Sequence, residues 1–184
     1  QTVSVGTNWK QVSAGFYATA AIKTDGTLWC WGNNYGGGLG DNTTTHRSSP
    51  VQTVAGGNNW KQASAGSAAA AGIKTDGTLW TWGDNSFGQL GDNSATHKSS
   101  PIQTVSGGTN WKTVYAGGSL GTSQMAAIKT DGTLWLWGNN ANGELGDNTI
   151  DGRSSPVQTV AGGTNWKQIS VGNASTGAIR DYEF

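Results

Sequence analysis

The chain has 184 residues with 11 basic and 11 acidic side chains, so its formal net charge is zero. Its length suits one domain, and no apolar run is long enough to span a bilayer. Only 34% of the residues are hydrophobic and 30 are glycine, but ten are tryptophan, which argues against a disordered chain because these rings can supply a core.

An internal repeat organises the chain. Leu28, Leu79 and Leu134 occupy the same place in three copies of the sequence IKTDGTLWxWG, so the copies are 51 residues (79 − 28) and 55 residues (134 − 79) apart. Repeats with periods of about 20 to 50 residues are typical of solenoids and propellers. The match extends along the whole chain, which predicts that one supersecondary unit is used repeatedly.

Each unit predicts four short strands. In the first unit these strands are 9–13, 18–23, 27–32 and 50–54, which are rich in aromatic or β-branched residues and are separated by Gly- and Asn-rich turns. The pair Asp25-Gly26 predicts a tight primed turn between the second and third strands, because glycine adopts a positive φ and aspartate tolerates it. Helices are not expected, since apolar residues do not recur at helical spacing and glycine is too frequent.

The repeat predicts an all-β fold, a β-propeller whose blades are four antiparallel strands. We expect a single repeat domain over residues 1–184, made of units at about 7–54, 58–105 and 109–160 and a partial unit at 164–184. About three and a half blades follow, whereas closed propellers have about four to eight. The ring is therefore expected to be incomplete, or to close with other copies or within a larger assembly. Gln1–Val3 match the end of a fourth strand, so we expect the terminal strands to pair outside this chain.

Tryptophan supplies most of the expected core. Side chains alternate along a strand, so Trp29 and Trp31 face one side of the first unit while Leu28 and Cys30 face the other. The expected structural core comprises the six tryptophans of the Leu-Trp-x-Trp motifs, Trp29, Trp31, Trp80, Trp82, Trp135 and Trp137. Cys30 is the single cysteine, and we expect it to be a small buried residue without a disulfide partner within the chain.

The second unit carries five linked motifs: Asp76-Gly77, Trp82-Gly83, Asn85, Gly88–Gly91 and Pro101. This set resembles the repeat of the regulator of chromosome condensation family, and the likeness extends over essentially the whole chain. The nearly identical units most resemble bacterial and bacteriophage members. Many members carry a histidine before the second strand, where this chain has Ala18, Ala69, Gln124 and Ser175. The role of that histidine is therefore not carried over.

Candidate metal and catalytic residues follow the repeat instead of interrupting it. His46 and His97 share one loop position about a blade apart, so they are expected to be solvated and not to converge on one ion. Asp41-Asn42 and its equivalents lack the spaced acids and the later glutamate of a calcium-binding loop. Their side chains are therefore expected to hydrogen-bond nearby backbone amides and fix the turn. No catalytic, metal or cofactor residue is expected, and neither is enzymatic activity.

The loops vary where the strands do not, and many binding sites are formed by variable loops on a constant scaffold. Aromatic side chains outside the tryptophan positions are favoured at protein contacts and at sugar-stacking sites. The third unit also has extra residues within 117–124. The candidate binding residues are Phe16, Tyr17, Tyr35, Phe87, Leu120 and Gln124. Neutral drift in tolerant loops is the alternative explanation for this variation.

These observations predict a non-catalytic propeller module with a structural or binding role, whose partner is a protein, a glycan or further copies of itself. The resemblance implies an extracellular setting, in a virion appendage or a bacterial surface protein. Three alternatives stay open: an enzyme-inhibiting propeller, a lectin, and a guanine-nucleotide exchange factor, for which no specific feature is matched. The basic residues lie on repeat positions and form no stripe that could follow a phosphate backbone, which argues against a nucleic-acid partner.

Overall fold

The computed structural model describes residues 8–119 and 121–181. The first blade contains β1 (Trp9–Ala14), β2 (Ala18–Lys23), β3 (Leu28–Gly32) and β4 (Arg47–Gln52), with the short 3-10 helix η1 (Tyr35–Gly37) between β3 and β4. The second contains β5 (Trp60–Ala65), β6 (Ala69–Lys74), β7 (Leu79–Gly83) and β8 (Lys98–Gln103). The third contains β9 (Trp111–Gly117), β10 (Gln124–Lys129), β11 (Leu134–Gly138) and β12 (Arg153–Gln158). A partial fourth blade consists of β13 (Trp166–Val171) and β14 (Thr176–Arg180).

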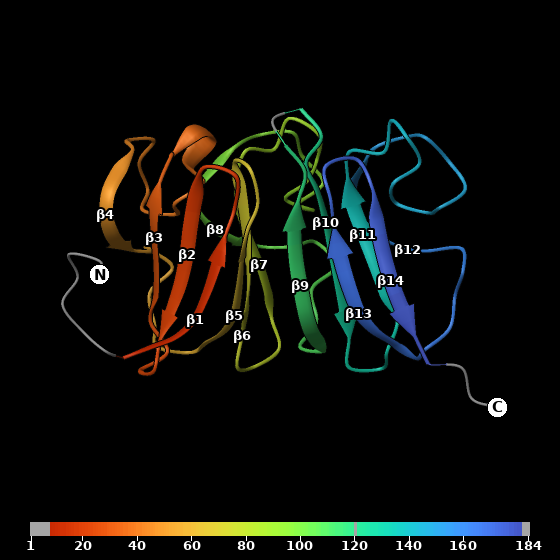
Figure 1. Ribbon diagram of the computed structural model, residues 1–184, viewed down its shortest axis with the longest axis horizontal. Coiled ribbons are helices and arrows are strands. Elements are labelled where there is room, and N and C mark those ends of the chain that lie inside the picture. The colour runs from red at the N-terminus through yellow and green to blue at the C-terminus, as the bar shows by residue number, and fades with distance from the viewer. Residues whose placement is uncertain (1–7, 120, 182–184) are drawn as a thin grey trace.

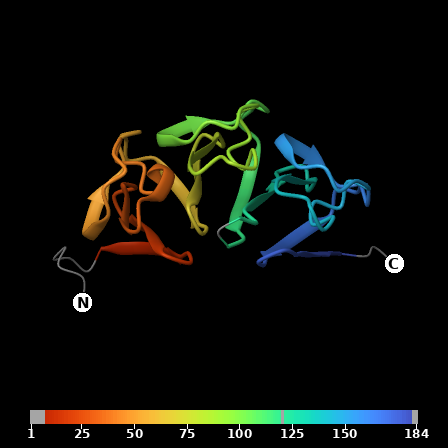
Figure 2. The same ribbon diagram turned by 90° about the horizontal axis from the view of Figure 1, so that it is seen from above.

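Each full blade is an antiparallel meander whose strands pair in chain order, and β13 pairs with β14 in a two-stranded sheet (Figure 1). The first strands of successive blades, β1, β5, β9 and β13, contact one another and follow the concave side of an arc (Figure 2). The predicted all-β propeller of about three and a half blades is confirmed, and the described blades form an open arc. No helix within the described ranges is long and apolar enough to cross a membrane.

The hairpin turn between the second and third strands differs from the one predicted. In the first blade the N–H of Gly26 donates to the carbonyl of Lys23 at 2.9 Å, and glycine alone in this turn has a positive φ, of 82°. This geometry is a type I turn followed by a left-handed glycine, not a two-residue primed turn. Asp25 accepts hydrogen bonds from the N–H and hydroxyl of Thr27, whose hydroxyl accepts one from Trp29 Nε1. The turn therefore also orients the first tryptophan of the third strand.

The blades pack through the two alternating faces of their third strands. The face of the first blade that carries Leu28 and Cys30 forms one buried cluster with Trp60 and Trp82 of the second blade. Trp82 is fully buried, and its Nε1 donates to the carbonyl of Gly38 at 3.0 Å. Its ring centroid lies 5.9 Å from that of Trp60. The interface between the second and third blades repeats this arrangement.

The expected core tryptophans differ in burial according to the blade in front of them. Trp82 and Trp137 are fully buried. Trp31 has the same place in the first blade but is half-buried, because no blade within the described residues covers its face. Trp60 and Trp111 lie outside the expected set, yet they are as buried as the two tryptophans that pack against them.

The other three expected core tryptophans lie at the border of the core. Trp29, Trp80 and Trp135 are half-buried. Each lies beneath a lysine ammonium from the second strand of its blade, at ring-centroid distances of 4.1, 4.4 and 4.2 Å. A cation over an aromatic face is attracted by the ring quadrupole. These contacts explain why a lysine recurs at the end of the second strand.

Within the described residues, the third interface has no third-strand tryptophan like the one that fills each of the other two interfaces. Leu134, Leu136 and Leu145 of the third blade cluster with Ile169 of the partial blade. A cavity of about 340 Å³ opens beside them, and it is also lined by Trp166, Thr176 and Ala178. In the full blades the third strand pairs with the second and brings its tryptophan to this place. Among the described residues, no third strand lies beside β14 to cover this face of the third blade.

Cys30 is expected to be unreactive in the folded protein. Its side chain is buried, and burial, with a smaller effect of the Asp41 carboxylate, raises the pKa of the thiol to about 12. Because the thiolate is the reactive form, iodoacetamide at about pH 8 should label Cys30 only after unfolding in denaturant. Mass spectrometry measures the labelling, and rapid stoichiometric modification of the native protein would contradict the buried position.

Candidate functional site: an aromatic pocket on the loop rim

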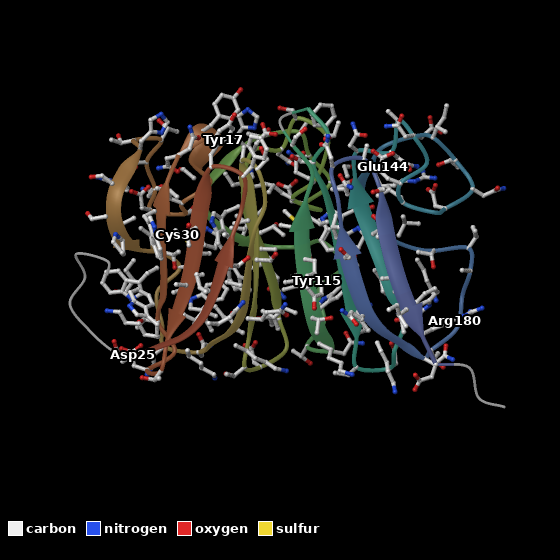
Figure 3. The ribbon with its side chains drawn as sticks, viewed as in Figure 1. Tyr17, Asp25, Cys30, Tyr115, Glu144 and Arg180 are labelled. Carbon is white, nitrogen blue, oxygen red and sulfur yellow. The ribbon has the colours of Figure 1, made fainter. Side chains whose placement is uncertain are left out.

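The variable loops gather at one end of the blades. Figure 3 places Tyr17, from the turn between β1 and β2, at the end opposite the hairpin residue Asp25. The long loop between β3 and β4 reaches the same end as the turn between β1 and β2 (Figure 1). We call this end the loop rim, meaning residues 15–17 and 33–46 of the first blade and their equivalents in the others.

A buried asparagine holds each long loop in shape. The amide of Asn34 donates to Asp41 at 3.1 Å and to two threonine carbonyls, and its side-chain oxygen accepts from the N–H of Leu39 at 2.8 Å. Asn85 and Asn140 make equivalent bonds in the other full blades. The shape of the loop is thus maintained from within, so its outward-facing residues can vary without loss of the framework.

His46 and His97 are exposed, as expected for loop histidines, and each also bonds to the backbone of its long loop. Nδ1 of His46 accepts the N–H of Asn34 at 2.9 Å, and Nδ1 of His97 accepts the N–H of Asn85 at 2.9 Å. The imidazole of each histidine thus acts as an acceptor for the start of its own long loop. Across the described residues, no three His, Cys, Asp or Glu side chains are grouped closely enough to hold a metal ion.

Asp41 ties the middle of the first long loop to its end. Its carboxylate accepts the hydroxyl of Thr43 at 2.6 Å and pairs with Arg47 at 2.7 Å. Burial raises the pKa of Asp41, but the hydrogen bonds from Thr43, Arg47 and Asn34 together lower it by more, so the pKa lies below its ordinary value of 3.8. Asp147 repeats this arrangement in the third blade. These aspartates therefore bond locally, within their own loops.

Stability is expected to fall in acid because of these carboxylates. A group whose pKa is lowered by folding contributes stability above its unfolded-state pKa, and the contribution is lost as the pH falls through the folded-state pKa. The free energy of unfolding should therefore decline below about pH 4, and it should decline less steeply in Asp41→Asn. Urea titrations at a series of pH values measure both slopes. Identical slopes for the parent and the variant would show that Asp41 gains nothing from its partners.

Three of the expected binding residues line one cavity on the loop rim. Tyr17, Tyr35 and Phe87 border a cavity of about 470 Å³, together with Asn33, Asp84, Ser86 and Gly121. Tyr17 and Tyr35 come from the first blade, Phe87 comes from the second, and Gly121 comes from the extended turn of the third. Tyr35 is 55% exposed and Phe87 is 36% exposed. Aromatic surface left in water around a hollow is typical of a contact site, and we call this cavity the aromatic pocket.

The remaining expected residues do not line the aromatic pocket. Phe16 lies beside it, with its ring edge-on to Tyr17 at a centroid distance of 4.6 Å. Leu120 lies outside the described residues. Gln124 is wrong as an exposed binding residue, because it begins β10, is fully buried and donates to two carbonyls of the partial fourth blade. Its amide therefore connects two blades and is not exposed.

Asp84 is the charged residue of the pocket, and sequence reasoning did not select it. Asn33 and Asn139 hold its position in the other full blades, so it is one of the few acids that interrupt the repeat. That interruption is the signal that could have identified it. Its carboxylate accepts hydrogen bonds from the hydroxyl of Ser86 at 2.8 Å and from the amide of Gln89 at 2.5 Å.

The fold and the site define a β-propeller repeat module with an aromatic pocket on its loop rim. The chain belongs to the regulator of chromosome condensation (RCC1) repeat family, since it matches that repeat over residues 25–71, 76–122 and 131–179. A second description of the same repeat matches residues 9–37 and 60–89. The resemblance inferred from the motifs of the second unit is therefore confirmed.

The relatives of this chain are longer proteins. It is 33% identical over 137 residues to the RCC1 domain-containing protein RUG3, mitochondrial, of Arabidopsis thaliana, a match that covers 73% of this chain and 30% of that protein. The yeast RCC1 protein Prp20, solved bound to Kap60, superposes with a TM-score of 0.80 at 18% identity, covering 97% of this chain and 43% of Prp20. The structure of Prp20p from Saccharomyces cerevisiae gives a TM-score of 0.76 at 20% identity, covering 96% and 45%. The chain thus spans less than half of each of these proteins, and the structural likeness shows the fold.

Proposed function

We propose that this chain is a non-catalytic propeller module that binds a protein partner through the aromatic pocket. The observation that carries the proposal is the convergence of Tyr17, Tyr35 and Phe87 on one cavity from three separate loops. The repeat does not need these rings, because Ser86 and Ala141 stand at the position of Tyr35 in the other full blades. Aromatic residues that folding does not require are available for contact with a partner.

The solved relatives support the choice of a protein as the partner. Prp20 was solved bound to Kap60, and the structure of Prp20p is described with its binding properties to Gsp1p and histones. Those partners are properties of Prp20. They favour a macromolecular partner for a propeller of this fold, and they do not specify which face of this chain would be used.

The proposal includes the extracellular or virion setting, which rests on the likeness of the repeat units to bacterial and bacteriophage members of the family. Three alternative functions remain for a propeller of this kind. An enzyme inhibitor would insert its loops into the active site of another protein, a lectin would stack sugars on the pocket rings, and an exchange factor would act on a small GTPase. The first is a special case of protein binding, while the third has no matching feature in this chain.

A comparison of three chains in a pull-down from host-cell extract tests the proposal. The double variant Tyr35→Ser, Phe87→Asn replaces each ring by a residue that another blade carries at the same position, so it should fold. Val105→Thr changes an exposed apolar residue outside the pocket and is the control. We expect the parent chain and the control to retain the same protein and the double variant to lose it. Equal capture by all three chains would exclude the pocket as the binding site.

A glycan array with the same three chains addresses the lectin alternative. Glycan binding that the double variant loses and the control keeps, without capture of any protein, would replace the proposed protein partner by a sugar. The aromatic rings would then act by stacking on the sugar ring.

Self-association is a second candidate function, which the open third interface favours. Among the described residues, β14 is an edge strand that pairs only with β13, and the cavity lies beside Leu134 and Leu136. Unpaired edges and exposed apolar surface promote association. We propose that another copy or a larger assembly covers this face, and the expected role of Gln1–Val3 in it lies outside the described residues. Light scattering should show association at micromolar concentration, whereas a stable monomer would contradict it.

A further inference from the structure

We propose that the aromatic pocket recognises a cationic side chain, a lysine or an arginine of the partner protein, with Asp84 as its counter-ion. This inference rests on the proposed function, because it names the chemistry of the group that a protein partner would insert. Three features of the pocket carry it: a buried carboxylate, uncharged donors around that carboxylate, and three aromatic walls.

The Asp84 carboxylate is largely removed from water. Its side chain is 9% exposed, and its two oxygens accept hydrogen bonds from the hydroxyl of Ser86 and the amide of Gln89. Both of these donors are uncharged. A buried charge is costly unless an opposite charge lies close to it. The pocket therefore favours a ligand that brings a positive charge to Asp84.

His97 does not supply that positive charge. Its Nδ1 lies 3.2 Å from the Asp84 carboxylate, but the same nitrogen accepts the N–H of Asn85 at 2.9 Å. A nitrogen that accepts a hydrogen bond has no proton to share with the carboxylate. His46 makes the same bond in the first blade, where Asn33 stands in place of Asp84. The histidine thus serves the loop framework whether or not an acid lies beside it.

Other aspartates of the long loops show how this chain usually balances a partly buried carboxylate. The aspartate after each Leu-Gly motif has its own cation: Asp41 with Arg47 at 2.7 Å, Asp92 with Lys98 at 3.7 Å, and Asp147 with Arg153 at 2.6 Å. Within the part of the chain that the structure describes, no lysine or arginine pairs with Asp84 in this way. Unlike these three aspartates, Asp84 has no lysine or arginine partner among the described residues.

The walls of the pocket suit a cation as well. Tyr17, Tyr35 and Phe87 present aromatic rings, and such rings attract a cation within about 6 Å of the centroid. The chain uses the same contact internally, since the ammonium of Lys74 lies 4.4 Å from the ring centroid of Trp80. A sugar could stack on the pocket rings too, but it is neutral and would not balance the charge of Asp84. The combination of rings and carboxylate favours lysine or arginine.

An NMR titration with small probes tests the chemistry directly. The probes are Nα-acetyl-arginine amide and Nα-acetyl-lysine amide, with Nα-acetyl-norleucine amide as an uncharged probe of similar length. We expect both cationic probes to shift the backbone amides of Asp84, Phe87 and Gly121 with a millimolar dissociation constant, and added salt to weaken the binding. Equal shifts with the norleucine probe, or no shift with either cationic probe at about 50 mM, would overturn the proposal.

Asp84→Asn is the decisive variant, because Asn33 and Asn139 show that the scaffold accepts asparagine at this position. It should raise the dissociation constant of the arginine probe by about tenfold or more. Asp151→Asn removes the same charge from an exposed loop position outside the pocket, so binding should not change. Binding that survives in Asp84→Asn, or that falls equally in Asp151→Asn, would show that Asp84 is not the counter-ion.

The proposed function and the cation assignment fail separately. If Asp84→Asn still captures a protein that the Tyr35→Ser, Phe87→Asn variant loses, protein binding at the pocket stands and the cation assignment is wrong. If the arginine probe binds through Asp84 but no protein is captured, the cation site stands and the proposed function is wrong.

Discussion

Replacing Trp82 by alanine is expected to lower the free energy of unfolding by about 3–5 kcal/mol. The indole is completely buried between the first and second blades, in one cluster with Leu28 and Cys30. Its removal leaves a cavity there, and it also leaves the carbonyl of Gly38 without its donor in a buried place. Urea unfolding followed by circular dichroism measures the loss.

Trp31→Ala is the matched control for this prediction. Trp31 lies in the same local sequence as Trp82. Its ring contacts Trp9 at a centroid distance of 6.1 Å, and Trp9 is the first-blade equivalent of Trp60. It is only half-buried, because its face of the first blade is uncovered within the described residues. Both tryptophans were expected in the core, but the structure predicts that Trp31→Ala costs less than about half as much as Trp82→Ala, in proportion to the buried area. Equal losses would show that the face of the first blade is covered in solution.

Gly77→Ala is expected to lower the free energy of unfolding by about 2–5 kcal/mol. Gly77 has a φ of 80°, which residues with a side chain rarely adopt. A Cβ there would also overlap the carbonyl oxygen of Thr109. That oxygen is part of the backbone that enters the third blade, so it cannot rotate away as a side chain would. The carbonyl of Gly77 also accepts the N–H of Trp111 at 3.1 Å. A displaced turn would therefore disturb the start of β9.

Gly107→Ala separates backbone strain from the steric overlap. Gly107 has a φ of 51°, but a Cβ there would meet no atom within 4 Å. Its substitution should cost only the left-handed conformation, about 1–2 kcal/mol. The same urea titrations compare the two variants. A cost for Gly77→Ala no greater than that for Gly107→Ala would contradict the close approach of the second and third blades.

The strands and their faces could be predicted because their determinants are local. The alternation from Leu28 to Trp31 and the turn at Asp25-Gly26 depend on residues a few positions apart. The prediction of the turn type was wrong, because Asp-Gly occurs both in two-residue primed turns and in type I turns that are followed by a left-handed glycine. The choice between them depends on where the flanking strands stop pairing.

The candidate site could be predicted only in part. Tyr35 and Phe87 were recognisable because aromatic residues interrupt positions that are small or polar in other units. Gln124 was wrongly expected in a binding loop, because it lies at the end of an insertion in the sequence. In the structure it pairs with Gly117 and Gly138, which places it inside a sheet. Asp84 was not selected, because nothing in its local sequence indicates that aromatic rings line the same cavity.

The sequence by itself determined the repeat, the position of the strands and the alternation of their faces, because strand pairing and side-chain direction follow from neighbours along the chain. Only the tertiary structure decided which tryptophans are buried and which residues meet in the aromatic pocket. Trp82 and Trp31 share a local sequence, yet only Trp82 has a blade in front of it. Tyr35 and Phe87 meet because the arc brings the loops of successive blades to the same rim. Burial and pocket lining depend on how the units are placed in space, which a pattern along the chain does not specify.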